Sequence, residues 1–313
     1  MFRKIIQTIT IVGIALILTA CQATESATPA VAPPALETLS PDKVLVLGDI
    51  SDDPAGTIED FQPMADYLAA HLADLGIEQG KVVVAPDLET MIAYLESGEV
   101  DLYFDSPYPA LTVYTEIGAH PLARRWKKGV SEYHTVIAVR QDSGLDGLDG
   151  LLGQIIAFDD PVSTSGYLLP KSYLIGLGYQ VVETNSLSDP VAADEIGYVF
   201  ASGEENVLAW VLQGKTAGSV IPSGDFENLE AGVQGQLTVL ARTPDVPRHI
   251  ALARPGMDDL LQTQIVELLS SSDQTPEGQA VLETFERTKK FDALPGGPEG
   301  IMDALEELFA PVR

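Results

Sequence analysis

The chain of 313 residues contains a single cysteine, Cys21, and only 18 lysine and arginine residues against 46 aspartate and glutamate residues. One cysteine excludes a disulfide within the chain and a metal site built from several thiolates. The formal net charge of −28 repels polyanions, so we expect neither nucleic acid nor an anionic lipid surface among the partners. After residue 20 the sequence has no apolar run long enough to cross a membrane.

The first 20 residues have the pattern of a secretory signal. Arg3 and Lys4 precede a mainly apolar stretch, and Leu18-Thr19-Ala20-Cys21 matches the cleavage pattern of bacterial lipoproteins. We therefore expect a signal peptide at 1–20, lipidation of Cys21, and a flexible tether rich in Ala, Pro, Thr and Ser at 21–41. Cleavage would remove two cations and change the net charge from −28 to −30. The expected location is outside the cytoplasm, anchored to the cell membrane by the lipid.

The rest of the chain alternates short apolar strands with helical patterns. Strands are predicted at 44–48, 81–86 and 100–106 in a first series and at 133–139, 153–158, 179–184 and 217–222 in a second. This alternation predicts α/β lobes with parallel sheets, whose ligands bind at the carboxyl ends of the strands. Segments near 128–134 and 240–250 are the expected hinges between the lobes. The basic stretch RRWKKG at 124–129 is interpreted as a solvated loop rather than a substrate funnel, with contact to a permease as an alternative role.

One stretch, FDDPVSTSGYLLP at 158–170, carries a cluster of hydroxyl side chains after a buried strand. A helix is predicted to begin close after Ser165, because Pro170 fits in or near a first helical turn. Ser163, Thr164 and Ser165 then lie at a helix N-terminus, where free N–H groups and the helix dipole favour an anion. Gly166 would let the backbone approach an oxyanion closely. Ordinary N-capping is the alternative interpretation. The stretch lacks the lysine of a Walker loop and the frame of a G-x-S-x-G elbow.

AFDDPVSTSGYLLP resembles the phosphate loop of the periplasmic phosphonate, phosphite and phosphate binding proteins of ABC transporters, the PhnD-like family. Further similar stretches are FQPMADYLAAHL (61–72), VVVAPDLETMIAYLESGEVDLYFDSPYPA (82–110), YHTVIAVRQDSGLDGLDGLLGQ (133–154), ASGEENVLAWVLQGKTAGSVI (201–221) and TPEGQAVLETF (275–285). The resemblance implies an α/β, two-lobe type II periplasmic-binding-protein fold, each lobe a sheet flanked by helices, with two hinge crossovers and a cleft between the lobes. Lobe 1 is expected at 42–131 plus 244–313 and lobe 2 at 132–243.

The resemblance also implies a function and a set of ligand-binding residues. It implies a binding protein that is not an enzyme, needs no cofactor or metal, acts as a monomer and delivers a small oxyanion to a membrane permease. By position, the residues that match the family's oxyanion site are Ser163, Thr164, Ser165, the Gly166 amide and Tyr133. Ser106 and Tyr108 of YFDSPYP are expected to offer donors from the wall of lobe 1, while Asp105 is interpreted as a helix cap rather than an orienting group. Tyr133 is equally well interpreted as a core residue.

Two departures from the aminoalkylphosphonate binders of the family affect the ligand. Glu204 stands where those proteins carry a histidine, and His249 stands where they carry an acidic residue. A carboxylate beside an oxyanion favours a ligand with a P–OH proton to donate, such as hydrogen phosphate, and disfavours a fully ionised sulfonate. Alternatively, Glu204 only stabilises the first turn of a helix.

Three hypotheses therefore remain open. The first is a phosphorus-oxyanion receptor, and the second is the same fold with another cargo, such as a sulfonate, a carboxylate or a thiamine-like precursor. The third is an anchored serine hydrolase with His249 as general base. The four histidines show no pair at metal-ligand spacing.

Overall fold

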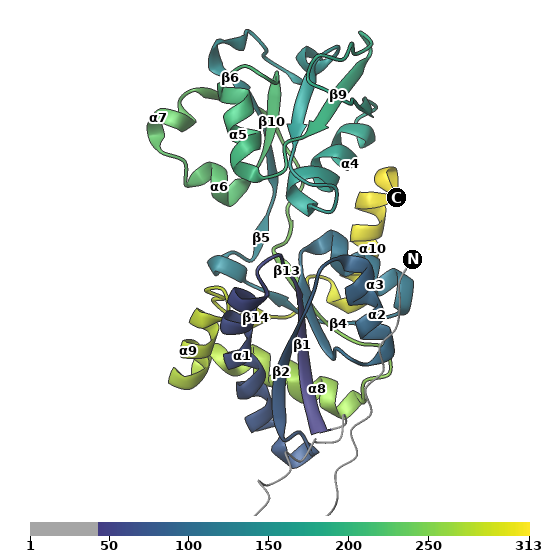
Figure 1. Ribbon diagram of the computed structural model, residues 1–313, viewed down its shortest axis with the longest axis vertical. Helices are drawn as coiled ribbons and strands as arrows, with labels where there is room; N and C mark the ends of the chain where they lie inside the picture. The colour runs from purple at the N-terminus through teal and green to yellow at the C-terminus, as the bar shows by residue number, and fades with distance from the viewer. Residues whose placement is uncertain (1–42) are drawn as a thin grey trace, which may run out of the picture. The chain divides into compact units, whose positions relative to one another are not determined.

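The computed structural model describes residues 43–313, so the expected signal peptide, Cys21 and the whole tether lie outside the described residues. The described chain forms two six-stranded sheets, each flanked by helices (Figure 1). We call each sheet with its helices a lobe. The expected fold class, a two-lobe type II periplasmic-binding-protein fold, is confirmed.

The sheet of lobe 1 has the strand order β14-β4-β13-β3-β1-β2. Its elements in chain order are β1 (Val44–Ile50), α1 (Pro54–His71), β2 (Gln79–Ala85), α2 (Leu88–Ser97), β3 (Leu102–Asp105), α3 (Pro107–Ile117), β4 (His120–Arg125), β13 (His249–Ala253) and β14 (Phe291–Asp292). Strand β1 runs parallel to β2 and β3, whereas β13 runs antiparallel to both β3 and β4. The three strands predicted for this lobe are parallel, as expected, and the antiparallel strand β13 enters the lobe when the chain returns to it.

The sheet of lobe 2 has the order β11-β6-β10-β7-β9-β8. Its elements are β6 (Thr135–Arg140), β7 (Ile155–Phe158), α4 (Leu169–Gly176), β8 (Gln180–Glu183), β9 (Glu195–Phe200), α5 (Glu204–Leu212), β10 (Gly218–Pro222), α6 (Ser223–Glu227), α7 (Ala231–Gln234) and β11 (Leu237–Arg242). Strands β7 to β10 pair in parallel, and β6 is antiparallel to β10 and β11. Strand β6 was predicted as part of a parallel sheet and is antiparallel to β10. Strands β4 and β9 were not predicted from the sequence.

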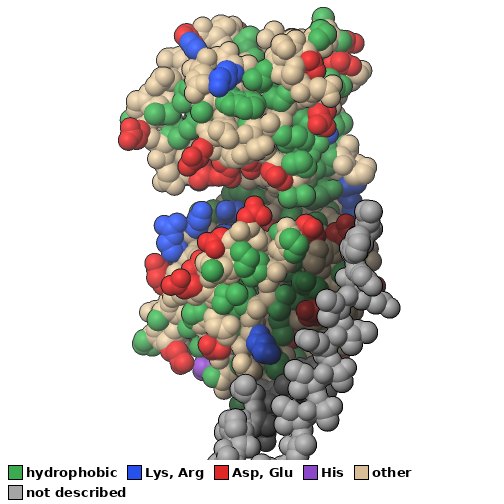
Figure 2. All heavy atoms as spheres, in the orientation of Figure 1, with side chains coloured by type: hydrophobic (Ala, Val, Ile, Leu, Met, Phe, Trp, Pro, Cys, Tyr) green, Lys and Arg blue, Asp and Glu red, His purple; other side chains and the backbone are tan. Residues whose placement is uncertain are grey.

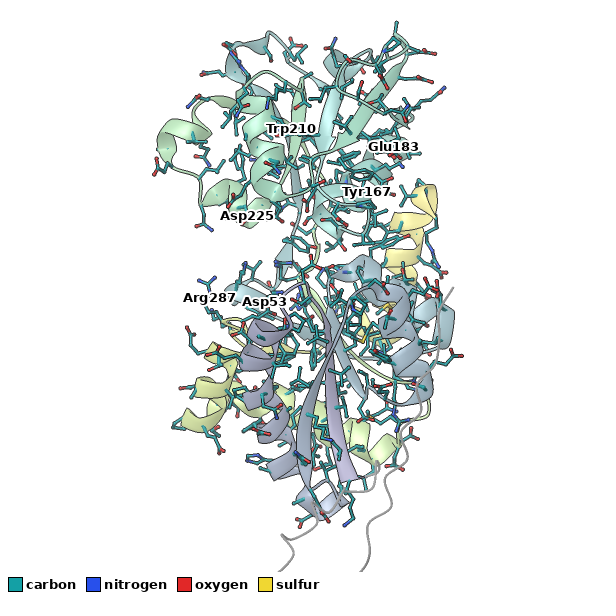
Figure 3. The ribbon with its side chains drawn as sticks, in the orientation of Figure 1. Asp53, Tyr167, Glu183, Trp210, Asp225 and Arg287 are labelled. Carbon is teal, nitrogen blue, oxygen red and sulfur yellow. The ribbon has the colours of Figure 1, made fainter. Side chains whose placement is uncertain are left out.

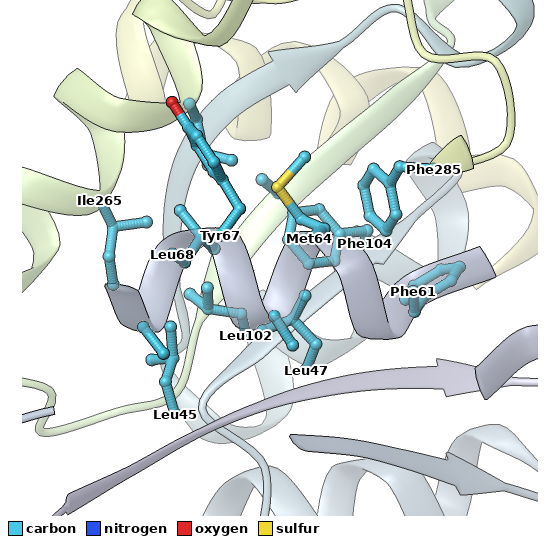
Figure 4. Packing of buried hydrophobic residues seen from close by; sticks show 14 of the residues in the cluster. Leu45, Leu47, Phe61, Met64, Tyr67, Leu68, Leu102, Phe104, Ile265 and Phe285 are labelled. Carbon is cyan, nitrogen blue, oxygen red and sulfur yellow. The ribbon is translucent and has the colours of Figure 1, made fainter. Parts of the chain in front are cut away.

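Helix α1 packs one apolar face on the sheet of lobe 1 (Figure 4). Phe61, Met64 and Leu68 recur at helical spacing and are fully buried against the alternating inward side chains of the strands. The C-terminal helices α8 (Asp259–Ser271), α9 (Pro276–Thr284) and α10 (Gly297–Phe309) also contact this lobe. Ile265 of α8 belongs to the same hydrophobic cluster as α1.

Strand β4 overturns the interpretation of RRWKKG as a solvated loop for its first two residues, Arg124 and Arg125. Arg125, its last residue, has a fully buried side chain whose guanidinium carbon lies 3.8 Å from the ring centroid of Phe285. Its Nη2 donates to Glu286 Oε2 at 3.1 Å and its Nε to Thr288 Oγ1 at 2.9 Å. Burial lowers the pKa of Arg125 to about 10, so the side chain remains a cation at neutral pH. The neighbouring turn Lys127–Gly129 remains at the surface.

Two segments connect the sheets. The chain leaves lobe 1 after β4 and enters lobe 2 at β6, then returns between β11 and β13. Within these segments β5 (Glu132–Tyr133) pairs with β12 (Val246–Pro247), so the two connections lie side by side. Among the helices of residues 43–313, none is long and apolar enough to span a bilayer.

Candidate ligand-binding cleft

A cavity of about 500 Å³ is lined by residues of both lobes and of the connecting segments. Its wall includes seven of the residues predicted from the sequence: Ser106, Tyr133, Ser163, Thr164, Ser165, Glu204 and His249. These side chains come from the ends of strands and the starts of helices that are far apart in the chain. The cavity size falls within the range of about 300–1,000 Å³ that is typical of small-molecule sites.

The hydroxyl loop, residues 163–166, follows β7 and begins a helix, as predicted. The first turn is a π-helix over Thr164–Leu168, which runs directly into α4. The Leu168 amide is bonded to the Ser163 carbonyl at 3.0 Å, so the amides of Thr164 and Ser165 precede the first donor inside the helix. Free amides at a helix start, beside hydroxyl groups and lining a cavity, provide donors for an anion.

The Thr164 hydroxyl connects the lobes. It accepts a hydrogen bond from the Tyr108 amide at 3.1 Å and donates to Ser106 Oγ at 3.0 Å. Ser106 Oγ in turn donates to Asp105 Oδ1 at 3.0 Å. In this conformation the hydroxyls of Thr164 and Ser106 therefore serve the contact between lobes, and Ser163 and Ser165 remain as the hydroxyls of the loop outside this chain of bonds.

Asp105 orients Ser106 and is not the cap of α3. Ser106 occupies the N-cap position of α3, and no side-chain hydrogen bond caps that helix. Asp105 accepts hydrogen bonds from the Tyr103 hydroxyl and from the Ser106 amide and hydroxyl. Burial raises the pKa of Asp105, while these hydrogen bonds act in the opposite direction.

Two predicted residues are not among those that line the cavity. The Gly166 amide donates to Ser163 Oγ at 3.0 Å, and a Cβ at Gly166 would lie 2.4 Å from the Cβ of Asp159. The glycine therefore allows close packing against Asp159 at this point. The ring of Tyr108 packs edge to face with Phe309, with 5.3 Å between ring centroids, so only the Tyr108 backbone reaches the hydroxyl loop.

Tyr133, His249 and Arg248 form the wall near the crossovers. Tyr133 is 3% exposed, and the guanidinium carbon of Arg248 lies 4.7 Å from its ring centroid. Burial raises the pKa of Tyr133, with Arg248 acting in the opposite direction. Burial, together with Lys127 and Arg248, holds the pKa of His249 well below its usual value, so the ring is neutral. Its Nδ1 atom has no hydrogen-bond partner among the described residues.

Glu204 faces the cavity from the first turn of α5. Burial raises the pKa of its carboxyl, and the carboxylates of Asp225 and Asp159 raise it further. Both interpretations from the sequence are compatible with this position, because the residue is at once a helix-start acid and a cavity-lining group. Figure 3 shows Asp225 at the edge of lobe 2.

Arg248 and Lys128 also line the cavity, although neither was predicted as a ligand-binding residue. Arg248 adjoins His249 in the returning segment, so its place next to a predicted site residue was the available signal. Lys128 belongs to the basic stretch interpreted as a solvated loop. Within residues 43–313, no group of three His, Cys, Asp or Glu side chains is arranged to hold a metal ion.

Comparison with known proteins gives a consistent set of relatives. The phosphate-import protein PhnD of Mycolicibacterium smegmatis is 28% identical over 167 residues, which are 51% of this chain and 50% of that protein. This chain thus matches about half the length of that curated relative.

Solved structures are similar over nearly the whole described chain. XAC2383 from Xanthomonas citri bound to chloride ion has a TM-score of 0.78 and 31% identity, covering 86% of this chain and 97% of that one. XAC2383 bound to ATP also has a TM-score of 0.78, with 28% identity over 87% of this chain and 100% of that one. PhnD1 from Prochlorococcus marinus, in complex with methylphosphonate, has a TM-score of 0.61 at 16% identity, covers 87% of this chain and 100% of that one, and shows the fold alone.

The family model that matches residues 50–294 is described as the periplasmic phosphonate substrate-binding protein of ABC transporters. The match includes the cavity-lining residues of both lobes. Together with the fold, it shows that the chain belongs to the periplasmic phosphonate substrate-binding proteins of ABC transporters.

Proposed function

We propose that this protein is a lipid-anchored receptor that binds a small phosphorus oxyanion, namely a phosphonate, phosphite or phosphate, in the cleft between its lobes. The observation that carries the proposal is the hydroxyl loop: Ser163 and Ser165 line the cavity at a helix start whose first amides have no partner inside the helix. Such a site provides several donors to the oxygens of one tetrahedral anion. The family consists of transport components, so the chain is not an enzyme and the hydrolase hypothesis is dropped.

We also propose the lobe boundaries, the lipid anchor, the monomeric state and the transport role of the protein. Lobe 1 comprises residues 42–131 and 244–313, lobe 2 comprises 132–243, and Cys21 carries the lipid. The receptor acts as a monomer outside the cytoplasm and delivers its ligand to the transmembrane subunits of an ABC permease. Closure occurs about the paired connections β5 and β12, whose side-by-side arrangement suits a hinge.

A second candidate ligand is a phosphate ester with a larger organic group. The structure of the relative XAC2383 bound to ATP and the cavity volume of about 500 Å³ favour it. A sulfonate or a thiamine-like precursor remains a further alternative cargo. Competition of each compound against methylphosphonate in one titration ranks these possibilities.

Calorimetry and thermal unfolding with protein freed of ligand test the proposal. Ligand at about 100 times its Kd adds about 2.7 kcal/mol of stability, which corresponds to about 5 °C in Tm for a chain of this size. We expect this shift with phosphate, phosphite or methylphosphonate. The double variant Ser163→Ala plus Ser165→Ala should lose it, because it removes two donors of the hydroxyl loop.

The matched control is Ser188→Ala, the same chemical change at an exposed serine that does not line the cleft. It should retain the ligand-induced shift. Since Ser163 also caps the helix, Kd values are compared at a temperature at which each variant is folded. Absence of binding by all three oxyanions, or unchanged binding by the double variant, contradicts the proposal.

A further inference from the structure

Two cationic side chains in the wall of the cleft have no carboxylate partner. Arg248 and Lys128 line the cavity, and in the part of the chain from residue 43 onward neither forms an ion pair. Their neighbours differ, since Arg124, Arg125 and Lys127 each pair with an aspartate or glutamate. Figure 2 shows lysine and arginine side chains gathered on lobe 1, along the edge that faces the gap between the two lobes.

Both cations are held in place by their surroundings. The Arg248 amide donates to the Ser131 carbonyl at 2.9 Å, and its guanidinium lies over the buried ring of Tyr133. Lys128 has a φ of 54°, in the left-handed region that is unfavourable for a lysine. The Gly129 amide fixes this turn by donating to the Trp126 carbonyl at 3.1 Å. Strain of this kind persists where the surrounding structure imposes it, and here it projects a lysine to the wall of the cleft.

The carboxylates of the same lobe are already occupied. Asp105 accepts hydrogen bonds from Tyr103 and Ser106, and Asp87 accepts one from the Thr90 amide at 2.8 Å. The wall of lobe 1 therefore has unpaired positive charge and satisfied negative charge. The hydroxyl loop on lobe 2 separately offers neutral donors for a first anionic group.

The cavity has room for more than one anionic group. Its volume is about 500 Å³, whereas a water molecule in the liquid occupies about 30 Å³ and a tetrahedral oxyanion only a few times that. The hydroxyl loop lines this space from lobe 2, together with Glu204 and Asp225, and the two unpaired cations line it from lobe 1. A ligand with an anionic group at each end would satisfy both.

We propose that Arg248 and Lys128 form a second anion subsite and that the ligand is a phosphonate with a second acidic group, such as a carboxylate, a few bonds from phosphorus. This inference rests on the proposed function, because the phosphorus group itself is held by the hydroxyl loop. The planar guanidinium of Arg248 suits bidentate contact with a carboxylate or a second phosphoryl group, and Lys128 adds a point charge. A phosphonate with an uncharged alkyl group leaves this subsite unused.

A different partner for the two cations is available within the protein. Glu204 and Asp225 line the cavity from lobe 2, and the charges of Arg248 and Lys128 lower the pKa of Glu204. If closure paired these residues across the cleft, the cations would stabilise the closed form with any ligand. The two arrangements differ in what happens when Arg248 is removed.

Calorimetry distinguishes the second anion subsite from pairing of the cations across the cleft. The two ligands are methylphosphonate, which has no carboxylate, and phosphonoacetate, which carries one on the same methyl group. We expect the wild-type full chain to bind phosphonoacetate at least about tenfold more tightly, since a charge-assisted contact between its carboxylate and Arg248 contributes that much or more. Arg248→Gln and Lys128→Gln should each remove most of this difference, because they weaken phosphonoacetate binding much more than methylphosphonate binding. Lys289→Gln, at an exposed lysine outside the cavity, is the control for the loss of one positive charge and should keep the difference.

Equal affinities of the wild type for the two ligands would overturn the second subsite, as would a preference that survives both substitutions. Equal weakening of both ligands in Arg248→Gln would also overturn it, in favour of pairing across the cleft. Lys128→Gln keeps the test informative if Arg248→Gln does not fold, because Lys128 lies in an exposed turn. Binding of neither ligand by the wild type would overturn the second subsite, and failure of phosphate and phosphite as well would refute the proposed function itself.

Discussion

Asp49, at the carboxyl end of β1, should make the protein less stable as the pH rises from 4 to 8. Burial raises the pKa of this carboxyl from 3.8 to about 7, and the nearby carboxylates of Asp105 and Glu286 add to the shift. The cations Lys127 and Arg125 oppose it only in part. Asp49 therefore carries an ionisation cost in the folded state that the unfolded chain does not have.

The sign and the size of the effect follow from these two pKa values. Below about pH 4 the carboxyl is protonated in both states and contributes nothing to the pH dependence. Between about pH 4 and 7 the folded state holds a proton that the unfolded state has lost, so the free energy of unfolding falls as the pH rises. The shift from 3.8 to about 7, at 1.36 kcal/mol per pH unit, sets a total loss of at most about 4 kcal/mol.

The variant Asp49→Asn removes the ionisation and keeps the shape of the side chain. Urea unfolding at 25 °C of ligand-free wild type and variant, at each pH unit from 4 to 8, gives the difference in free energy of unfolding. We expect this difference to move in favour of the variant between pH 4 and 7, by up to about 4 kcal/mol, and to be constant above that range.

Asp74→Asn, the same change at an exposed aspartate, is the control and should follow the wild type. A difference between Asp49→Asn and wild type that stays flat from pH 4 to 8 would refute the reasoning. It would mean that Asp49 ionises as readily in the folded state as in the unfolded chain.

Three further predictions concern the fold and the ligand. Arg125→Met should destabilise the protein by about 1–3 kcal/mol in urea unfolding, because it removes the hydrogen bonds of Arg125 to Thr288 and Glu286 while Lys127 still pairs with Glu286; no loss of stability would contradict the role of these bonds. Gly80→Ala should cost about 1–3 kcal/mol, because a Cβ there would lie 2.2 Å from the backbone of α1. Gly224→Ala, with no atom within 4 Å of the added Cβ, is its control, and equal stability of the two variants would count against the close packing of α1 on β2. Glu204→Gln should weaken hydrogen phosphate binding and leave sulfate binding unchanged in competition titrations; an equal effect on both anions would leave Glu204 only its role at the start of the helix.

Most strands and helices could be predicted because their buried residues recur at regular spacing within a short stretch of sequence. Strand β1 is a run of apolar residues, and α1 places its apolar residues at helical spacing. Strand β4 could not be predicted in this way, since HPLARR contains a proline and two arginines. Arg125 is compatible with a buried strand only because Glu286 and Thr288, some 160 residues later, supply its partners.

The candidate site also combines features set by neighbouring residues with features set by contacts between distant segments. The order of hydroxyl groups in residues 163–166 indicated an anion-binding helix start, because that property depends on neighbouring residues and backbone direction. The bond between Thr164 and Ser106 depends on how the two lobes meet. The packing of the Tyr108 ring on Phe309 depends on how α10 folds back onto lobe 1, and local sequence specifies neither.

By itself, the sequence determined the alternation of strands and helices and the position of the hydroxyl loop at a helix start, since hydrophobic periodicity and helix capping act over a few residues. Only the tertiary structure decided which charges remain unpaired in the cleft. Arg125 and Arg248 are both arginines near a crossover, yet one is buried against Glu286 and the other lines the cavity. Their difference arises from contacts between distant segments, which form only when the chain is folded.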